Sequence, residues 1–434
     1  MGGESLEGSG DARRLFTSST RLFAARIVAY IASLGMLVVT AKELGASGRG
    51  ELVLIVTLVA FTTLVCSLGV PVAGRLLLID EHEPVPLADH LGLAVLLSAV
   101  QGIVAPAIAA VFLPLADVKL EPITFLFIGV FAALSGFLYL GESTLMALGR
   151  APASAGWDAV GFAAQATACA GLVLLADPGV TAFVAAFGLS LVMPIAGILI
   201  HLAKSGHRVR FAISVASWRR LVSTGWPSLG TVLSEAAVFR VDRLVLGVLA
   251  TPSAVGVYSV GATAAEILRF VPTSVNALVF YEVVMRRIAA RDLRRIRLAT
   301  LGVMLVMASV GALIAPAVIE NTLGSSFVGA VDAFRILLLS EFGMALYLLD
   351  STILTSSRQV RLAALAALIG FAFILVTDMA LIPAFAVAGA AWASVISYWA
   401  MAGSARYLLV HARRKGQVGV LDAGPLVTPT LIEG

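Results

Sequence analysis

The chain has 434 residues, of which 59% are hydrophobic and 13% charged, and its mean hydropathy is +0.99. Soluble domains are about 25% charged, so this composition excludes an ordinary soluble protein and indicates that membrane hydrocarbon is the main solvent. The net charge of +4 is spread over several short hydrophilic segments, which gives no reason to expect a nucleic-acid partner.

Taken in chain order, the sequence is a succession of continuous apolar runs separated by short hydrophilic gaps. A membrane-spanning helix needs about 20 apolar residues, and it satisfies its backbone donors and acceptors within its own segment. We therefore predict an all-α polytopic membrane protein with twelve transmembrane helices. The predicted spans are residues 22–41, 52–74, 91–114, 123–147, 157–176, 180–203, 221–249, 255–283, 298–319, 331–355, 362–382 and 385–409.

The basic residues alternate between the two sides of the predicted membrane. Of the 30 lysines and arginines, Lys42, Arg49 and Lys119 lie in the odd-numbered gaps, whereas most of the others lie in the even-numbered gaps and the two tails. By the positive-inside rule both termini are expected in the cytoplasm, which agrees with an even number of spans. Because arginine far outnumbers lysine, we expect a GC-rich bacterial source and a multi-pass protein of the bacterial cytoplasmic (inner) membrane.

The longest internal hydrophilic segment, residues 204–220, separates six predicted spans from six. Its apolar residues interleave with arginines, as in a segment that lies in the membrane interface, although an ordinary solvated linker fits equally well. The predicted parts are a cytoplasmic tail over 1–20, an N-terminal six-helix lobe over 21–203, the interfacial linker over 204–220, a C-terminal six-helix lobe over 221–410 and a cytoplasmic tail over 411–434.

The two predicted lobes share a weak internal similarity. Residues 44–61 join the first two spans through a glycine-rich turn, and residues 249–265 join spans seven and eight in the same way. In this comparison Gly50 and Gly256 correspond after one gap. Two lobes related by repetition are typical of transporters whose substrate site lies between the repeats, near the middle of the membrane.

Three motifs stand out: the LG-x-x-x-x-G turn after the first span, Asp242 followed by a VGVYS turn, and the segment LIPAFAVAGAAWASVISY near the C-terminus. Together they resemble the polysaccharide and lipid-linked oligosaccharide flippases of the multidrug/oligosaccharidyl-lipid/polysaccharide (MOP) exporter superfamily. In that family the last signature contains Pro, then Gly, then Gly-Ala-Ala. Pro383 and Gly389 match it, whereas Ala386 or Ala388 replaces the first glycine. The resemblance covers essentially all the spans and implies a MOP-type transporter fold.

Ionisable residues inside the spans are the strongest functional lead. Each costs roughly 2.5 to 3.5 kcal/mol on insertion scales, so such residues usually face the protein interior and mark an ion pair or a pathway. If spans seven and eight form a hairpin, Glu235 and Arg269 lie at one depth, and Arg240 and Glu266 at another. We predict two ion pairs or one network. It either locks the hairpin, or it binds an anionic substrate through its arginines while Glu235, Glu266 or Asp242 takes up a coupling ion.

Arg26 lies about a turn and a half inside the first span with no acid within helical reach, so it needs a partner from another helix or an anionic ligand. Snorkelling to the headgroups is the alternative. The resemblance to lipid-II type flippases implies that Arg26 and Arg269 belong to a cationic central cavity. Near the start of span seven, Gly225, Pro227 and Gly230 predict a bend, which is either a hinge for alternating access or a static kink.

The predicted function, as the resemblance implies, is transfer of an undecaprenyl-pyrophosphate-linked saccharide across the membrane by alternating access of the two lobes. Arginine binds diphosphate bidentately, which favours Arg26, Arg269 and Arg240 as substrate-binding residues. The expected partners are the lipid-linked saccharide and membrane lipids, and the driving ion, a proton or sodium, is left open.

Two alternatives belong to other functional classes. A cation-coupled multidrug exporter of the same superfamily would use Glu235, Asp242 or Glu266 as its ion site, but Arg26 stands where such exporters commonly carry an acid or no charge. A polytopic polysaccharide polymerase or glycosyltransferase would need a sizeable loop with acids or histidines, and the longest internal loop is basic. The sequence contains no phosphate-binding glycine loop, nucleophile elbow or metal motif, so we expect neither an enzyme nor a cofactor.

Overall fold

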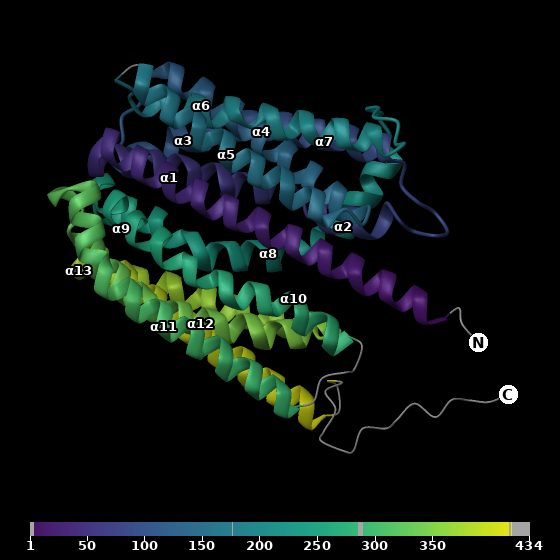
Figure 1. Ribbon diagram of the computed structural model, residues 1–434. Helices are drawn as coiled ribbons and strands as arrows, with labels where there is room; N and C mark the ends of the chain where they lie inside the picture. The colour runs from purple at the N-terminus through teal and green to yellow at the C-terminus, as the bar shows by residue number, and fades with distance from the viewer. Residues whose placement is uncertain (1–3, 176, 285–289, 416–417, 419–434) are drawn as a thin grey trace.

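The computed structural model describes residues 4–175, 177–284, 290–415 and 418. Figure 1 shows two groups of roughly parallel and antiparallel helices lying side by side, the N-lobe (α1 to α7) and the C-lobe (α8 to α13). The start of α1 and the end of α13 lie at the same end of the bundle (Figure 1). We call this the terminal end and the opposite end the far end.

The described helices keep mainly apolar surfaces toward the surroundings, as expected when lipid is the solvent. The N-lobe contains α1 (Glu4–Cys66), α2 (Val70–Leu77), α3 (Leu87–Leu115), α4 (Pro122–Ala147), α5 (Ala151–Leu175), α6 (Val180–Ser190) and α7 (Val192–Lys204). The C-lobe contains α8 (Val215–Leu249), α9 (Pro252–Ala265), the 3₁₀ turn η1 (Glu266–Arg269), α10 (Phe270–Val284), α11 (Ala290–Leu323), the 3₁₀ turn η2 (Ser325–Phe327), α12 (Gly329–Ser356) and α13 (Val360–Arg414).

The first helix contains two membrane passes joined at Gly45, whose φ of 63° is non-helical. Arg49 donates a hydrogen bond to the hydroxyl of Thr40, nine residues earlier. In a straight helix these residues would be about 13 Å apart along the axis, so the chain doubles back at Gly45. Glycine tolerates a positive φ without the steric cost that a Cβ atom brings, which explains the glycine-rich turn in the sequence.

The last helix doubles back in the same manner at Ala386, whose φ is 45°. A Cβ atom on Gly389 would lie 2.3 Å from the main-chain carbonyl oxygen of Leu381, so the two passes touch through their backbones just after the turn. Ala386 is one of the two alternatives for the position of the first glycine in the C-terminal signature, and its positive φ is a conformation that favours glycine. The C-terminal signature is therefore a turn between two passes.

Nine helices among the described residues are long and apolar enough to cross a membrane. Two of them, α1 and α13, are the folded-back helices and contribute two passes each. The remaining pass is α8, whose charged residues keep it outside that apolar set. The described chain thus contains the twelve predicted passes, and the all-α polytopic fold is confirmed.

At the far end the lobes touch through main chain rather than side chains. A Cβ atom on Gly50 would lie 1.7 Å from the carbonyl oxygen of Pro252, and one on Gly256 would lie 1.9 Å from that of Ala46. Only glycine permits such an approach at either position. The two glycines that correspond in the internal similarity therefore pack against each other across the lobe boundary.

At the terminal end the lobes touch through another glycine pair and through polar contacts. A Cβ atom on Gly69 would lie 2.1 Å from the carbonyl oxygen of Gly225. The hydroxyl of Ser217 donates to the carboxylate of Asp89 at 2.6 Å, and the indole N–H of Trp218 donates to the main-chain carbonyl of Asp89 at 2.8 Å. The beginning of α8 is thereby held on the N-lobe.

Helix α8 passes from one lobe to the other. It begins at Val215, inside the segment 204–220 predicted as a linker. Leu221 packs in a cluster with residues of α2 and α3, whereas Val238 packs in a cluster with residues of α12 and α13. The three predicted hinge residues lie inside the unbroken helix: Gly225 at the edge of the N-lobe contact, against Gly69, and Pro227 and Gly230 between the two packing regions.

Candidate functional site

A cavity of about 340 Å³ lies between the lobes, lined by α1, α4 and α8. Its walls are mostly apolar, with polar groups from Thr63, Ser135 and Tyr139 on the N-lobe side. From the C-lobe side Ala236 and Arg240 face it. Among the described residues that line this central cavity, Arg240 is the one with a charged side chain.

Arg240 has no acidic partner within ion-pair distance in the described part of the chain. Glu266 is within electrostatic range, but its carboxylate accepts a hydrogen bond of 2.8 Å from Arg243 instead. The predicted pair of Arg240 with Glu266 is therefore wrong. The consequence is a guanidinium at the cavity wall whose donors are not occupied by a carboxylate.

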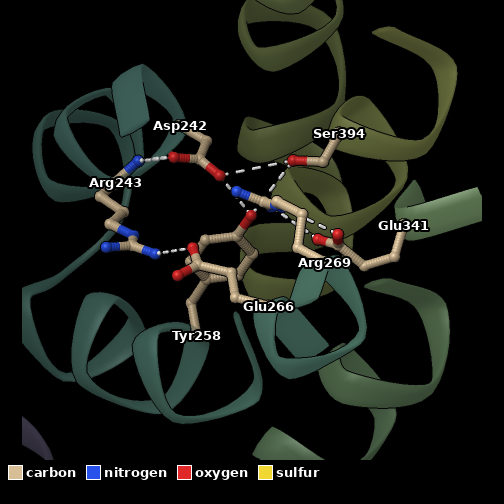
Figure 2. A network of polar contacts seen from close by, with 7 residues as sticks. All are labelled: Asp242, Arg243, Tyr258, Glu266, Arg269, Glu341 and Ser394. Carbon is tan, nitrogen blue, oxygen red and sulfur yellow. Dashed lines mark hydrogen bonds and ion pairs between the residues drawn. The ribbon is translucent and has the colours of Figure 1, made fainter. Parts of the chain in front are cut away.

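The predicted pair of Arg269 with Glu235 is also wrong. Arg269 instead makes two parallel hydrogen bonds to Glu341 of α12, from Nε to Oε2 at 2.8 Å and from a terminal nitrogen to Oε1 at 2.6 Å. Its guanidinium also lies 5.2 Å from the ring centre of Phe239 and 5.9 Å from that of Tyr398. Figure 2 shows the side chain of Arg269 directed toward Glu341. Because the guanidinium is bonded bidentately to this carboxylate and stacked on aromatic rings, protein groups already occupy it.

Asp242 is the centre of a second group of polar contacts (Figure 2). It is 3% exposed and accepts hydrogen bonds from the Tyr258 hydroxyl, from the main-chain N–H of Arg243 at 2.7 Å and from Ser394 at 3.4 Å. The neighbouring ion pair of Arg243 with Glu266 closes the network. These contacts join α8, η1, α9 and α13, so Asp242 holds several passes of the C-lobe together.

The predicted depth matching failed because two residues at equal depth on neighbouring helices need not face each other. Residues Glu266–Arg269 also form a 3₁₀ turn, which changes the rise and the direction of the side chain of Arg269. Glu235 accepts a hydrogen bond of 2.7 Å from the hydroxyl of Tyr347 on α12. The C-lobe does contain buried charged contacts, but they do not join the four predicted residues to one another. Two of the partners, Glu341 and Tyr347, come from α12, which lies outside the predicted hairpin.

Asp378 of α13 is a functional candidate that the sequence showed only as an isolated acid. It is fully buried, and neither carboxylate oxygen has a hydrogen-bond partner among the described residues. Asp242 lies within its electrostatic range. An ionised carboxylate without hydrogen bonds is costly in the protein interior, so this acid favours either a bound proton or a cation. Sequence reasoning missed the pair because nothing local shows that α8 and α13 are neighbours.

Arg26 is exposed on the terminal half of α1, and Asp158 of α5 lies within its electrostatic range. The two side chains form no ion pair, so a partner from another helix or an anionic ligand for Arg26 stays a prediction. Tyr30, one turn further along α1, lies within electrostatic range of both Arg26 and Arg269. Arg26 of the N-lobe and Arg269 of the C-lobe, the two arginines implied by the family resemblance, are thus both near Tyr30, although Arg26 is exposed and Arg269 is paired with Glu341.

No group of three or more His, Cys, Asp or Glu side chains suited to a metal ion occurs among the described residues. A site for a monovalent cation needs fewer carboxylates, because hydroxyl and carbonyl oxygens complete the shell. Asp378 has no hydrogen-bond partner among the described residues and lies within electrostatic range of Asp242, whose own oxygens accept hydrogen bonds from Tyr258, Arg243 and Ser394.

Comparison with known proteins places this architecture in a family. A family model described as "Polysaccharide biosynthesis protein" matches residues 16–281. No curated protein matches the chain. Among solved structures, the lipid II flippase MurJ in an inward closed conformation is 13% identical with a TM-score of 0.74, over 92% of this chain and 87% of the flippase.

Two further structures share the fold. A MOP superfamily transporter from Pyrococcus furiosus is 16% identical with a TM-score of 0.62, over 92% of this chain and 94% of that one. An inward-facing multidrug resistance MATE family transporter is 14% identical with a TM-score of 0.62, over 91% and 94%. At these identities the likeness concerns the fold. The family match covers more than half of the chain, which therefore belongs to the polysaccharide biosynthesis protein family and has the multi-pass helical fold seen in MOP superfamily transporters.

Proposed function

We propose that the protein moves a saccharide linked to undecaprenyl diphosphate across the bacterial cytoplasmic membrane. The observation that carries the proposal is the central cavity between the lobes, in which Arg240 provides a positive charge without a carboxylate partner. Such a site attracts an anionic diphosphate, and the neutral polar groups of Ser135 and Tyr139 suit sugar hydroxyls. The lipid tail stays in the bilayer while the headgroup crosses between the lobes.

The distribution of basic residues makes the terminal end cytoplasmic and the far end external. The central cavity is lined by α1 residues between Val56 and Leu64, which places it toward the terminal end of that pass. Accessible Arg26 lies on the same side and would meet the diphosphate first. We assign Arg269 a positioning role, because its contacts with Glu341 and two aromatic rings hold α12 and α13 behind Arg240.

Alternating access requires that the far-end and terminal-end contacts open in turn. The start of α8 packs with the N-lobe and its later half with the C-lobe, so relative motion of the lobes must bend α8 between them. Gly225, Pro227 and Gly230 occupy that stretch, where the missing proline N–H and the glycines lower the resistance to bending. We assign these three residues the hinge.

Coupling to a proton or a monovalent cation is assigned to Asp242 and Asp378. The two carboxyl groups belong to α8 and α13, and one of them lacks hydrogen-bond partners. Binding a cation between them would draw these helices together, whereas its release would leave two carboxylates that repel each other. Glu235 and Glu266 serve as fixed acceptors for Tyr347 and Arg243.

The second candidate, export of cationic drugs, is favoured by the buried acids of the C-lobe. Against it, the central cavity contains Arg240 and no acidic side chain among its described lining residues, so it repels a cationic drug. The saccharide carrier is therefore the better-supported substrate.

The test is complementation of a bacterial strain that lacks its own undecaprenyl-linked oligosaccharide flippase, with all variants at equal membrane abundance. We expect rescue by the wild type, loss of rescue by Arg240→Gln and reduced rescue by Arg26→Gln. The matched control is Arg335→Gln, an exposed arginine whose contacts are two long hydrogen bonds of 3.3 and 3.4 Å to the Ala312 carbonyl, and it should rescue fully. Failure of the wild type to rescue, with resistance to cationic dyes, would replace the proposal by drug export.

A further inference from the structure

Arg49 was expected in the exposed turn between the first two spans, but the structure buries it. Its side chain is 8% exposed and lies within the second pass of α1. One terminal nitrogen donates to the hydroxyl of Thr40 at 2.5 Å, and Nε is buried with no acceptor.

Among the described residues no carboxylate approaches Arg49. The charged side chain within its electrostatic range is Arg243, which is also a cation and is already paired with Glu266. Buried arginines that serve structure alone are normally compensated, as Arg269 is by Glu341. A buried cation with a free donor and a like-charged neighbour is instead a site prepared for an anion that is absent from the protein itself.

The position of Arg49 gives this site a place in the transport path. It directly precedes Gly50, whose main chain touches Pro252 and Gly256 in the far-end contact. Val56, the first cavity-lining residue of the same pass, is seven positions further along, or about 10 Å of helix rise. When the lobes separate at the far end, the opening therefore forms beside Arg49.

We propose that Arg49 is a second binding station for the diphosphate group, used as the headgroup leaves the central cavity at the far end. Arg240 is the first station, toward the cytoplasm, and the inference rests on the proposed function. A diphosphate carries enough negative charge to satisfy Arg49 and to relieve its repulsion with Arg243. In the closed arrangement the station is shut off by the main-chain contact at Gly50.

The first test compares Arg49→Met with the wild type in proteoliposomes that contain a fluorescent undecaprenyl-diphosphate saccharide. Lys42→Met, which removes an exposed cation at the end of the first pass, just before the Gly45 turn, is the matched control. We expect Arg49→Met to slow headgroup transfer by about tenfold or more, and Lys42→Met to remain within about twofold of the wild type. The melting temperature of Arg49→Met should equal or exceed that of the wild type, because an uncompensated buried charge has been removed.

Two outcomes would overturn the inference. Transfer at the wild-type rate would show that Arg49 does not touch the headgroup. A melting temperature lowered by several degrees, together with slow transfer, would show that Arg49 supports the fold.

A second measurement separates this inference from the proposed substrate. Inorganic diphosphate should raise the melting temperature of the wild type and of Lys42→Met, and should lose part of that effect in Arg49→Met. If the wild type transfers no saccharide carrier but this dependence holds, the proposed function fails while the anion station stands. If Arg49→Met responds to diphosphate as the wild type does, the station is refuted whatever the substrate.

Discussion

Arginines in the charged interior of the C-lobe are paired with carboxylates, whereas the described arginines between the two lobes are not. In the C-lobe, Arg269 and Arg243 each have a carboxylate within 2.8 Å, and the first is also stacked between two rings. Between the lobes, Arg240 and Arg49 have no carboxylate at that distance among the described residues. The sequence places all four in or beside apolar spans, so the location of a charge does not reveal its role. The presence or absence of a countercharge does.

Removing the countercharge of Arg269 should have the largest effect on stability. Glu341→Gln leaves a buried guanidinium without its bidentate partner, and breaking a buried pair costs about 3 to 5 kcal/mol. We expect the free energy of unfolding in mixed micelles to fall by that amount. The double variant Arg269→Met, Glu341→Met removes both charges and should recover most of the loss. If Glu341→Gln is as stable as the wild type, Arg269 belongs with the unpaired arginines.

A smaller effect on the free energy of unfolding is expected when the lost contact joins a carboxylate to a neutral hydroxyl rather than to a cation. Tyr347→Phe removes the hydrogen bond to Glu235 and should lower the free energy of unfolding by about 1 to 2 kcal/mol. The control is Tyr407→Phe, since Tyr407 is 71% exposed and its hydroxyl makes no hydrogen bond to the described protein. Equal effects of the two changes would mean that the Glu235 contact is not made in the membrane.

The smallest change in stability should come from giving Arg240 the countercharge that it lacks. Ala236 faces the central cavity one turn before Arg240, so Ala236→Glu creates an i, i+4 pair worth about 0.2 to 0.5 kcal/mol. Complementation should nevertheless fall sharply, because the cavity loses its net positive charge. Ala236→Gln, of similar size and no charge, should complement better. Full activity of Ala236→Glu would exclude Arg240 as the substrate site.

The fold could be predicted well from the sequence because run length alone identifies membrane passes. Helix α8 was found despite its charges, since its apolar residues extend over a full pass. The turns at Gly45 and Ala386 fall in or next to the predicted gaps. That Gly50 touches the region of Gly256 could not be predicted, because a repeat specifies similar local structure and not how the repeats pack.

The candidate site could be predicted only in part. The charged network was found from the cost of charge in a membrane, but its pairing was wrong because neighbours in sequence need not be neighbours in a bundle. Glu341 reaches Arg269 from α12, and Asp378 of α13 lies within electrostatic range of Asp242. Which helices meet is decided by many small packing contacts spread over the lobe. Arg49 was predicted to lie in the gap between the first two spans, but it is buried in the second pass. The helix of that pass begins before its continuous apolar residues do, and a charged residue at this point suggested a gap.

The main-chain contact between Gly50 and the start of α9 also affects whether small ions can leak across the membrane at the far end. A gap of about 0.5 to 1 Å between touching backbones already forfeits about a quarter to a half of their dispersion energy, and neither glycine has a side chain that could stretch across a widening gap. A small opening therefore loses much of the contact energy. We therefore expect the far-end contact to be either closed or fully open, so that small ions do not leak through a partly opened contact.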